Sequence, residues 1–370
     1  MGAHINALSV ILAALHSYIG VRLLAPFPVA VQLAGVAVLA GVFWLLPKGF
    51  RFRSEQPWRI WAPWLMTGFF SWLLVLTFAR DLALAALKLA GLGGHEEWIR
   101  ASAAAVLAAT PLITAIGYAM ARRTAGVVTV KVPIAGLAPA LDGFTIAQIS
   151  DIHVGPTIKG PYVEAIVERV NGLEPDMVAI TGDLVDGSVA ELSRDTAPLE
   201  HLVSRHGTYV VTGNHEYYSG AQAWVAELRR LGARVLLNEH VVLEHDGAPL
   251  TVAGVTDFSA HHFDPSQKSD AKAALAGSPE GSPKILLAHQ PRSAAGAAQA
   301  GADLQLSGHT HGGQFWPWNL FVRLQQPFTA GLHRLGRMWV YINRGTGYWG
   351  PPMRFGIPSE ITRIRLVRAG

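Results

Sequence analysis

The stretch IAQISDIH, residues 146–153, is a short apolar run that ends in an acid and a histidine. Apolar runs that lead into Asp, Asn or His follow in VAITGDLVD (178–186), YVVTGNHE (209–216), ILLAHQP (285–291) and LQLSGHTHGGQ (304–314). Each apolar run has the length and composition of a buried strand. In open α/β sheets, ligands bind at the carboxyl ends of strands. We therefore expect these five polar clusters to meet in one crevice.

The second part of the chain alternates predicted strands with predicted helices from residue 126 onward. Helical spacing is clearest at Tyr162–Val170 and Ala221–Leu231, and a Gly/Ser/Pro cluster at 277–283 predicts a surface loop. The remaining predicted strands are Val127–Val132, Phe144–Ile149, Met177–Ile180, Tyr209–Val211, Lys284–Ala288, Asp303–Leu306 and Trp339–Ile342. This alternation predicts an α/β domain over residues 126–370, with helices covering the sheets.

The residue types in the clusters favour a site for two metal ions. The chain has no cysteine, so metal ligands must come from His, Asp, Glu or Asn. Oxygen ligands combined with neutral imidazoles suit Mn²⁺, Fe or Zn²⁺ better than Ca²⁺. Two ions bridged by a carboxylate can clamp a phosphate and acidify a water. We expect Gly182, Gly213 and Gly308 to allow sharp turns that direct the neighbouring ligands toward the metals.

The ordered series DIH, GDLVD, GNHE, AHQP and GHTHGGQ resembles the calcineurin-like metallophosphoesterase superfamily over residues 142–367. The stretch NRGTGYWGPPMRFGIPSEIT, residues 343–362, and the apolar start resemble its transmembrane, YaeI/YkuE-like branch. They are also similar to a chlamydial hydrolase of UDP-2,3-diacylglucosamine. The resemblance implies two mixed β-sheets packed face to face and flanked by helices. It also implies hydrolysis of phosphoester or phosphoanhydride bonds with two divalent ions.

Carried over residue by residue, the resemblance assigns a role to each polar cluster. The first metal would be held by Asp151, His153 and His311, the second by Asn214, His289 and His309, with Asp183 bridging both. His215 matches the family's catalytic histidine, and a protonated imidazole there can stabilise phosphoryl charge and protonate the leaving oxygen. We expect Asp186 and Glu216 to orient ligands rather than bind metal. Arg344 is either a substrate-phosphate contact or a structural turn residue.

The first 125 residues are predicted to form four membrane-spanning helices. Half of the 370 residues are hydrophobic and only 15% are charged, well below the roughly 25% of a typical soluble protein. Four apolar runs approach or exceed the roughly 20 residues that a spanning helix needs. They are Ile5–Ala25, Val29–Leu46, Trp61–Ala79 and Trp98–Ala121. The segment Arg80–Gly94 is either an interfacial helix or an extension of the third span, which would place Arg80 and Asp81 unusually deep.

Basic residues beside the spans predict how the chain crosses the membrane. Seven lie on one side, namely Lys48, Arg51, Arg53, Arg59, Arg122, Arg123 and Lys131. Four lie on the other, namely Arg22, Arg80, Lys88 and Arg100. Because cytoplasmic loops carry the excess of Lys and Arg, we expect a multi-pass inner-membrane protein with its catalytic domain in the cytoplasm. The net charge of +4 is spread along the chain, so no nucleic-acid surface is expected.

These patterns favour a membrane-anchored metallophosphoesterase that acts on a lipid-linked phosphoester or pyrophosphate. The alternatives are a general phosphodiesterase or phosphatase for soluble substrates, a non-catalytic membrane scaffold, and a transporter with a regulatory domain. Aromatic and apolar residues after the last predicted ligands form either domain core or a surface that enters the membrane interface. They are Phe315, Trp316, Trp318, Leu320, Phe321, Tyr348 and Trp349. His201, His206, His240 and His245 are predicted at the surface, and His261 and His262 in a loop that could line a substrate entrance.

Overall fold

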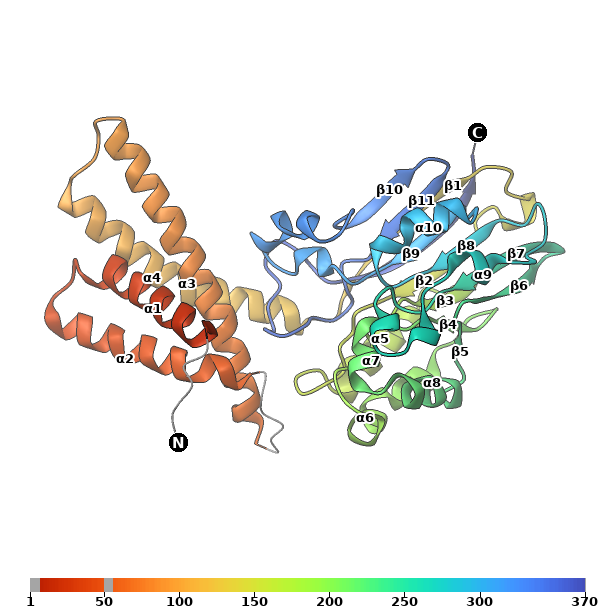
Figure 1. Ribbon diagram of the computed structural model, residues 1–370, viewed down its shortest axis with the longest axis horizontal. Coiled ribbons are helices and arrows are strands. Elements are labelled where there is room, and N and C mark those ends of the chain that lie inside the picture. Colours follow the sequence, from red (N-terminus) through yellow and green to blue (C-terminus); the bar gives the residue numbers. More distant parts are fainter. Residues whose placement is uncertain (1–6, 50–55, 370) are drawn as a thin grey trace. The chain divides into compact units, whose positions relative to one another are not determined.

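The computed structural model describes residues 7–49 and 56–369, and the chain divides into two compact units. One comprises Met1–Arg122 with Gly350–Met353, and the other comprises Arg123–Trp349 with Arg354–Gly370. The predicted start of the first span at Ile5, and Arg51 and Arg53 in the orientation count, lie outside the described residues. Figure 1 labels the helices and strands of both units.

Within residues 7–49 and 56–122, the first unit has four helices that are long and apolar enough to cross a membrane. They are α1 (Ala7–Leu24), α2 (Val29–Leu45), α3 (Pro57–Leu89) and α4 (Glu96–Arg122). Buried apolar side chains from all four helices pack together, including Ile19, Val42, Phe70 and Ala103. The four predicted spans thus correspond to four helices that share one apolar core.

Helix α3 is longer than the predicted third span, and of the two interpretations of Arg80–Gly94 it supports an extension of that span. It continues as one helix through Arg80 and Asp81 to Leu89. Its 33 residues would extend about 50 Å at 1.5 Å per residue, more than the roughly 30 Å of a hydrocarbon core. The last turns of α3 must therefore extend beyond the apolar layer or tilt within it, and Arg80 and Asp81 lie near that boundary.

Two mixed β-sheets of six strands each form the second unit, all within residues 126–369. In order across the first sheet, the strands are β1 (Gly126–Ile134), β12 (Glu360–Arg368), β2 (Thr145–Ile149), β3 (Met177–Ile180), β4 (Thr208–Val210) and β5 (Arg234–Val235). Across the second, they are β10 (Gly331–Leu335), β11 (Met338–Ile342), β9 (Leu304–Ser307), β8 (Lys284–Leu287), β7 (Ala248–Gly254) and β6 (Glu239–His245). This arrangement confirms the predicted fold class.

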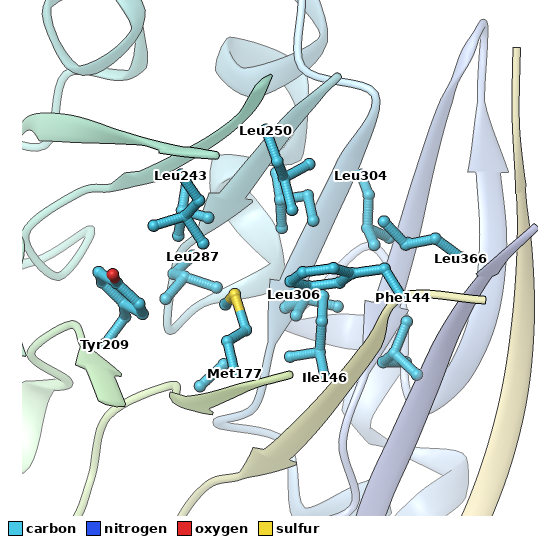
Figure 2. Close-up of a cluster of buried hydrophobic side chains, with 14 of the residues drawn as sticks. Phe144, Ile146, Met177, Tyr209, Leu243, Leu250, Leu287, Leu304, Leu306 and Leu366 are labelled. Carbon is cyan, nitrogen blue, oxygen red and sulfur yellow. The ribbon is translucent and has the colours of Figure 1, made fainter. Parts of the chain in front are cut away.

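Apolar side chains from the two sheets face one another and form the main core of the second unit. Figure 2 shows Ile146 and Met177 of the first sheet pointing toward Leu250, Leu287 and other side chains of the second. These side chains are almost completely buried. Burying apolar area of this kind contributes roughly 25 cal/mol per Å² removed from water. The core fixes the distance between the sheets, and with it the positions of the loops at the strand ends.

Helices cover the outer faces of the sheets and complete the α/β architecture (Figure 1). Helix α8 (Ala221–Arg230) contacts β5, while α9 (Ala271–Leu275) contacts β6 and β7. Helices α5 (Gly160–Asn171), α6 (Val189–Thr196), α7 (Asn214–Ser219) and α10 (Ala294–Gln299) complete the set within residues 126–369. The predicted strands and helices of this unit are present, with ends shifted by at most two residues.

The surface prediction for His245 is wrong. Its side chain is buried, and its ring packs edge-on against Phe144 with centroids 4.9 Å apart. Its Nδ1 lies 3.0 Å from Nε2 of His206, which is itself partly buried. The alternating burial of strand β6 turns His245 toward the sheet interior, and a polar residue type gave no sign of this.

Candidate metal centre

The five polar clusters meet because they follow neighbouring strands of the two sheets. Strands β2, β3 and β4 run parallel to one another, so their carboxyl ends share one edge of the first sheet. Strands β8 and β9 are parallel neighbours in the second sheet. Backbone bonds continue along each edge, since the N–H of Asp151 donates to Gly182 O at 3.0 Å in the first sheet and that of Gly308 to His289 O at 2.9 Å in the second. The two edges are linked by the N–H of His309, which donates to Asp151 Oδ1 at 2.9 Å.

Three predicted ligands of the first metal form one compact group. Ligand atoms of Asp151, His153 and His311 all lie within 4.8 Å of one another, and all three side chains are buried. The Nε2 atoms of His153 and His311 are 3.0 Å apart, and Nε2 of His311 is 3.4 Å from Oδ1 of Asp151. Three such atoms facing one point fit the demands of a divalent cation.

A second group lies around Asp183, the predicted bridge. Ligand atoms of Asp183, His289 and His309 lie within 4.8 Å of one another. Asp183 Oδ2 is 3.1 Å from Nε2 of His289 and 4.0 Å from Nε2 of His153, so this carboxylate reaches both groups. His289 Nδ1 lies 2.7 Å from Thr181 O, an outer contact that orients the ring and leaves Nε2 toward the site.

The amide of Asn214 provides an independent test of whether these residues fit metal ions. Its Oδ1 atom is buried and has no hydrogen-bond partner among the described residues. A buried acceptor without a partner costs about 1–3 kcal/mol, so such atoms normally have one. A divalent cation would satisfy this oxygen. The clustered histidines and aspartates, together with this oxygen, suggest a site for two divalent metal ions.

The backbone of the site is held in an uncommon conformation. Five predicted ligands have positive φ values between 50° and 71°, namely Asp151, His153, Asp183, His309 and His311. Such conformations cost roughly 1–3 kcal/mol each in residues other than glycine and concentrate at functional sites. We expect the packing of the two sheets to maintain this strain, because the ligands follow directly from the ends of buried strands.

The three glycines of the site act in two different ways. Gly182 has φ +87° and needs the conformational freedom expected of it. Gly213 and Gly308 do not have positive φ, and their role is to leave space. A Cβ atom would collide with the Asp183 carboxylate at Gly213 and with the Asp151 carboxylate at Gly308. The sharp-turn expectation was therefore incomplete, since two of these glycines allow a carboxylate to approach the backbone.

His215 lies beside the metal-binding groups and is held by two aspartates. Its Nδ1 is 2.6 Å from Asp186 Oδ1, its backbone N–H donates to Asp183 Oδ1 at 2.8 Å, and its Nε2 is 3.9 Å from Asp183 Oδ2. Burial alone would lower the pKa of His215, but the bond to Asp186 and the charge of Asp183 raise it to about 9. The imidazole is therefore protonated at neutral pH in the metal-free protein.

Asp186 and Glu216 occupy positions that orient other groups. Oδ1 of Asp186 lies 3.0 Å from Nδ1 of His153 as well as 2.6 Å from that of His215, so one oxygen holds both rings. Glu216 is buried and accepts backbone N–H bonds from Asp183, Leu184 and Gly213. These contacts match the expected orienting roles, although Asp186 also lies within ligand distance of His153 and His215.

Two arginines border the site, and sequence reasoning singled out only one. The Nε and Nη2 atoms of Arg344 pair with Glu360 Oε2 at 2.6 and 2.5 Å, which favours its structural interpretation. Arg354 is completely buried and donates to the carbonyl oxygens of His311, Arg344 and Gly347. Burial lowers its pKa to about 10. No local pattern marks Arg354, because its role depends on two loops that meet only in the fold.

His261 and His262 lie in the short helical turn Ala260–His262, where His262 is exposed and His261 partly exposed. Their rings contact each other at 4.1 Å, and neither belongs to a metal-binding group among the described residues. The neighbouring Phe263 packs against Tyr218, which in turn packs against His215. The turn therefore approaches the site only through other aromatic rings.

The two sheets bring Asp, His and Asn side chains together at their strand ends, and one buried amide oxygen among them is unpaired within the described residues. This combination is typical of the class of binuclear metallophosphoesterases. The profile of the calcineurin-like phosphoesterase family matches residues 144–313. A metallophosphoesterase of Aquifex aeolicus is 33% identical over 227 residues, which cover 61% of this chain and 85% of that protein. The chain belongs to the calcineurin-like metallophosphoesterase family.

Relatives with membrane-related and YkuE names support the predicted branch. A "transmembrane protein with metallophosphoesterase domain" from Bos taurus is 42% identical over 272 residues, covering 70% of this chain and 61% of that protein. The metallophosphoesterase YkuE of Bacillus subtilis is 29% identical over 233 residues, covering 61% of this chain and 79% of that protein. The match to the bovine protein thus spans less than two thirds of its length.

Proposed function

We propose that the chain is a membrane-anchored hydrolase that cleaves phosphoester or phosphoanhydride bonds with two divalent metal ions. The observation that carries this proposal is the grouping of six predicted ligands into two compact sets, together with the buried oxygen of Asn214, which is unpaired among the described residues. His215 is held beside them by Asp186. In the assignment we propose, Asp151, His153 and His311 hold one ion, Asn214, His289 and His309 hold the other, and Asp183 bridges them. The ions would neutralise phosphate charge and supply a nucleophile at neutral pH.

His215 is the proposed general acid. Its Nδ1–H donates to Asp186, which holds the ring in place and leaves Nε2–H directed toward the metal-binding groups. In this position the Nε2 proton can pass to the leaving oxygen as the phosphoester bond breaks. The positive charge also stabilises the phosphoryl oxygens before transfer. Asp186 acts through His215 and His153 and is a positioning residue.

The substrate is proposed to be lipid-linked, such as a nucleotide-activated acylated sugar. Within residues 123–349, large apolar side chains gather in one exposed segment after the last predicted ligands. Their exposed fractions are 43% for Trp316, 41% for Trp318, 64% for Leu320, 52% for Phe321 and 81% for Leu324. Phe315 and Tyr348, which were grouped with them, are buried and belong to the domain core. Exposed Trp and Phe side chains of this kind are typical of surfaces that enter a membrane interface.

A short chain of contacts connects this exposed segment to the catalytic histidine. Gln314 exchanges two hydrogen bonds with the backbone of Trp349, at 2.9 and 2.8 Å. The ring of Trp349 lies 5.8 Å from that of His215 and is 46% exposed. The leaving group must lie beside His215, the proposed general acid. An acyl chain lying on this segment would thus extend from that side of the site.

The membrane connection supports the same substrate class. Three residues, Arg123 to Ala125, link the end of α4 to the start of β1. Three residues span at most about 11 Å.

A general phosphodiesterase or phosphatase for soluble substrates is the second candidate, because the site residues define a reaction centre without defining the rest of the substrate.

The experiment uses the full chain in detergent and has two arms. Removing metal with a chelator is expected to abolish hydrolysis of a phosphodiester, and Mn²⁺ to restore it. In the second arm, a lipid-bearing phosphoester is compared with its water-soluble headgroup analogue. The double variant Trp318→Ser, Phe321→Ser is expected to lower kcat/KM for the lipid about tenfold and to leave the headgroup analogue unchanged.

Val203→Ser is the matched control, since Val203 is 66% exposed and lies outside the segment that follows the last predicted ligands. Full activity in a verified metal-free preparation would contradict the proposed reaction. Equal turnover of the two substrates would reject the lipid-linked substrate and leave the general phosphodiesterase.

A further inference from the structure

A polar network ties three helices of the membrane unit together around Asp81. Its Oδ2 accepts hydrogen bonds from Tyr18 Oη at 2.8 Å and Arg22 Nε at 2.7 Å. Its Oδ1 accepts from Arg22 Nη2 at 3.0 Å and Arg80 Nη1 at 2.9 Å. Arg80 also donates to Ser102 Oγ and to Ile99 O, both at 2.9 Å. The carboxylate of Asp81 is thus fully engaged by two arginines and a tyrosine.

This network forms one wall of a pocket of about 450 Å³. The pocket lies where α1 ends, the last turns of α3 pass and α4 begins. Besides the network, the lining includes Lys88, Trp98 and the apolar side chains of Leu84 and Leu87. Its walls therefore combine basic side chains with the apolar faces of three helices.

The charges that line the pocket are not balanced. Arg22, Arg80 and Lys88 are cationic, and Asp81 is the one carboxylate in the lining, which leaves an excess of two positive charges. Within residues 7–49 and 56–369, neither Lys88 Nζ nor Arg22 Nη1 has an acceptor. A network that served only to hold the helices together would need no further cation beside it. Uncompensated charge near the apolar layer is costly unless an anion joins it.

The depth of the pocket indicates where that anion comes from. Arg22 lies in the last turn of α1, and Asp81 lies 24 residues into α3, about 36 Å from its start. This places the pocket near the edge of a roughly 30 Å hydrocarbon core, at headgroup level. Trp98, 45% exposed in the lining, is the residue type that favours this level. Arg and Lys side chains at this level can bind the phosphate of a lipid headgroup through charge-assisted hydrogen bonds.

We propose that this pocket binds the phosphate headgroup of an anionic phospholipid, with Arg22 and Lys88 contacting the phosphate and Arg80 holding Asp81 in place. The apolar residues of the lining, such as Leu84 and Leu87, would lie along the first carbons of the acyl chains. The site is separate from the proposed metal centre, and its occupation does not depend on phosphoester hydrolysis.

Native mass spectrometry of the full chain in detergent tests this site. Phosphatidylglycerol is titrated against phosphatidylcholine, and anionic lipid is expected to bind more tightly. Lys88→Gln is expected to weaken phosphatidylglycerol binding about fivefold, the effect of about 1 kcal/mol per basic residue. Arg22→Gln should weaken it at least as much. Arg100→Gln is the matched control, because Arg100 is a basic residue near the start of α4 but outside the lining, and it should bind like wild type.

Each other outcome rejects the proposal. Equal binding of the two lipids, or the same loss in Arg100→Gln as in Lys88→Gln, would indicate general surface attraction. Competition by inorganic phosphate at the concentration of the lipid would indicate a free-anion site. Lys88 makes no contact within the Asp81 network. An unchanged thermal midpoint of the Lys88→Gln variant in phosphatidylcholine would therefore show that its weaker lipid binding does not come from a loss of folding.

Discussion

Asp183 and His215 lie side by side in the site, but their surroundings differ, and we propose different roles for them. Asp183 directs Oδ2 toward His289 at 3.1 Å and toward His153 at 4.0 Å, so it faces both metal-binding groups. His215 is held through Nδ1 by Asp186, and in the role we propose it offers Nε2 to a substrate. A carboxylate between two cations and an imidazolium at their side are what phosphoryl transfer requires.

Substituting these two residues should therefore have different effects. Asp183→Asn keeps the shape of the side chain but removes the bridging charge, so we expect metal to be lost from the protein. His215→Ala should keep metal content near that of wild type and slow turnover by about 10²–10⁴-fold, the usual contribution of a general acid. Metal content by elemental analysis and kcat measured on the same samples separate the two. Equal loss of metal in both variants would contradict the proposed roles.

The raised pKa of His215 predicts how the stability of the metal-free protein depends on pH. Its folded pKa of about 9 lies above the usual 6.5, so its protonation stabilises the fold fully below pH 6.5. This contribution is lost as the pH rises from 6.5 through 9. The thermal midpoint of the chelated wild type should fall more steeply over this range than that of His215→Gln.

His262→Gln controls for that pH experiment, since His262 is exposed and lies outside the metal-binding groups. It should keep the wild-type slope. Parallel slopes for wild type and His215→Gln would show that the ion pairs of His215 do not contribute to stability.

At the scale of elements, the long helix α3 carries charge that its neighbours must compensate. Arg80 has a side-chain exposure of 4%, and its three partners come from two helices, namely Asp81 on its own helix and Ser102 and Ile99 on α4. Arg22 and Tyr18 bring α1 to the same carboxylate. The network therefore determines how the ends of these helices pack.

We expect Asp81→Asn to destabilise the helical unit more than Arg80→Met. Removing the carboxylate charge leaves the buried Arg80 cation uncompensated, whereas removing Arg80 leaves Asp81 paired with Arg22 and Tyr18. The double variant should recover part of the loss. The measurement is the thermal midpoint of the full chain in detergent, and a larger effect of Arg80→Met would contradict this account of the network.

For the whole molecule, the connection between the units limits which side of the membrane the second unit can occupy. Three residues follow α4 before β1 begins, so the domain stays on the side of the membrane where α4 ends. The excess of Lys and Arg around Lys48–Arg59 and Arg122–Lys131 favours the cytoplasm for that side.

A reporter fused to the carboxyl terminus tests this orientation. A fluorescent protein that folds only in the cytoplasm should be active there, while alkaline phosphatase, which needs the periplasm, should be inactive at the same position. Activity of the phosphatase fusion alone would reverse the orientation. Fusions in the loop before α4, at Gly93, should give the opposite pattern in each case.

Much of the fold and of the candidate site follows from local properties of the sequence. An apolar run of about 20 residues needs no distant partner to be recognised, and the same holds for a strand that ends in Asp-x-His or Gly-Asn-His. The four helices, the α/β class of the second unit and the convergence of the polar clusters could be predicted for this reason, whereas the two mixed sheets packed face to face were implied by the family resemblance. The carboxyl ends of parallel strands meet wherever such a sheet forms, so Asp151, Asp183 and Asn214 were expected to lie together.

Only the tertiary structure decided which residues pair across long separations in the sequence. Asp81 meets Arg22 across 59 positions, Arg354 reaches His311 across 43, and His245 turns into the core beside Phe144. It also showed that Gly213 and Gly308 make room for carboxylates, and that Phe315 is buried while Trp316 is exposed. Periodicity records which face of an element is apolar. Periodicity does not predict which distant side chain contacts that face, because this contact depends on how the sheets and helices pack.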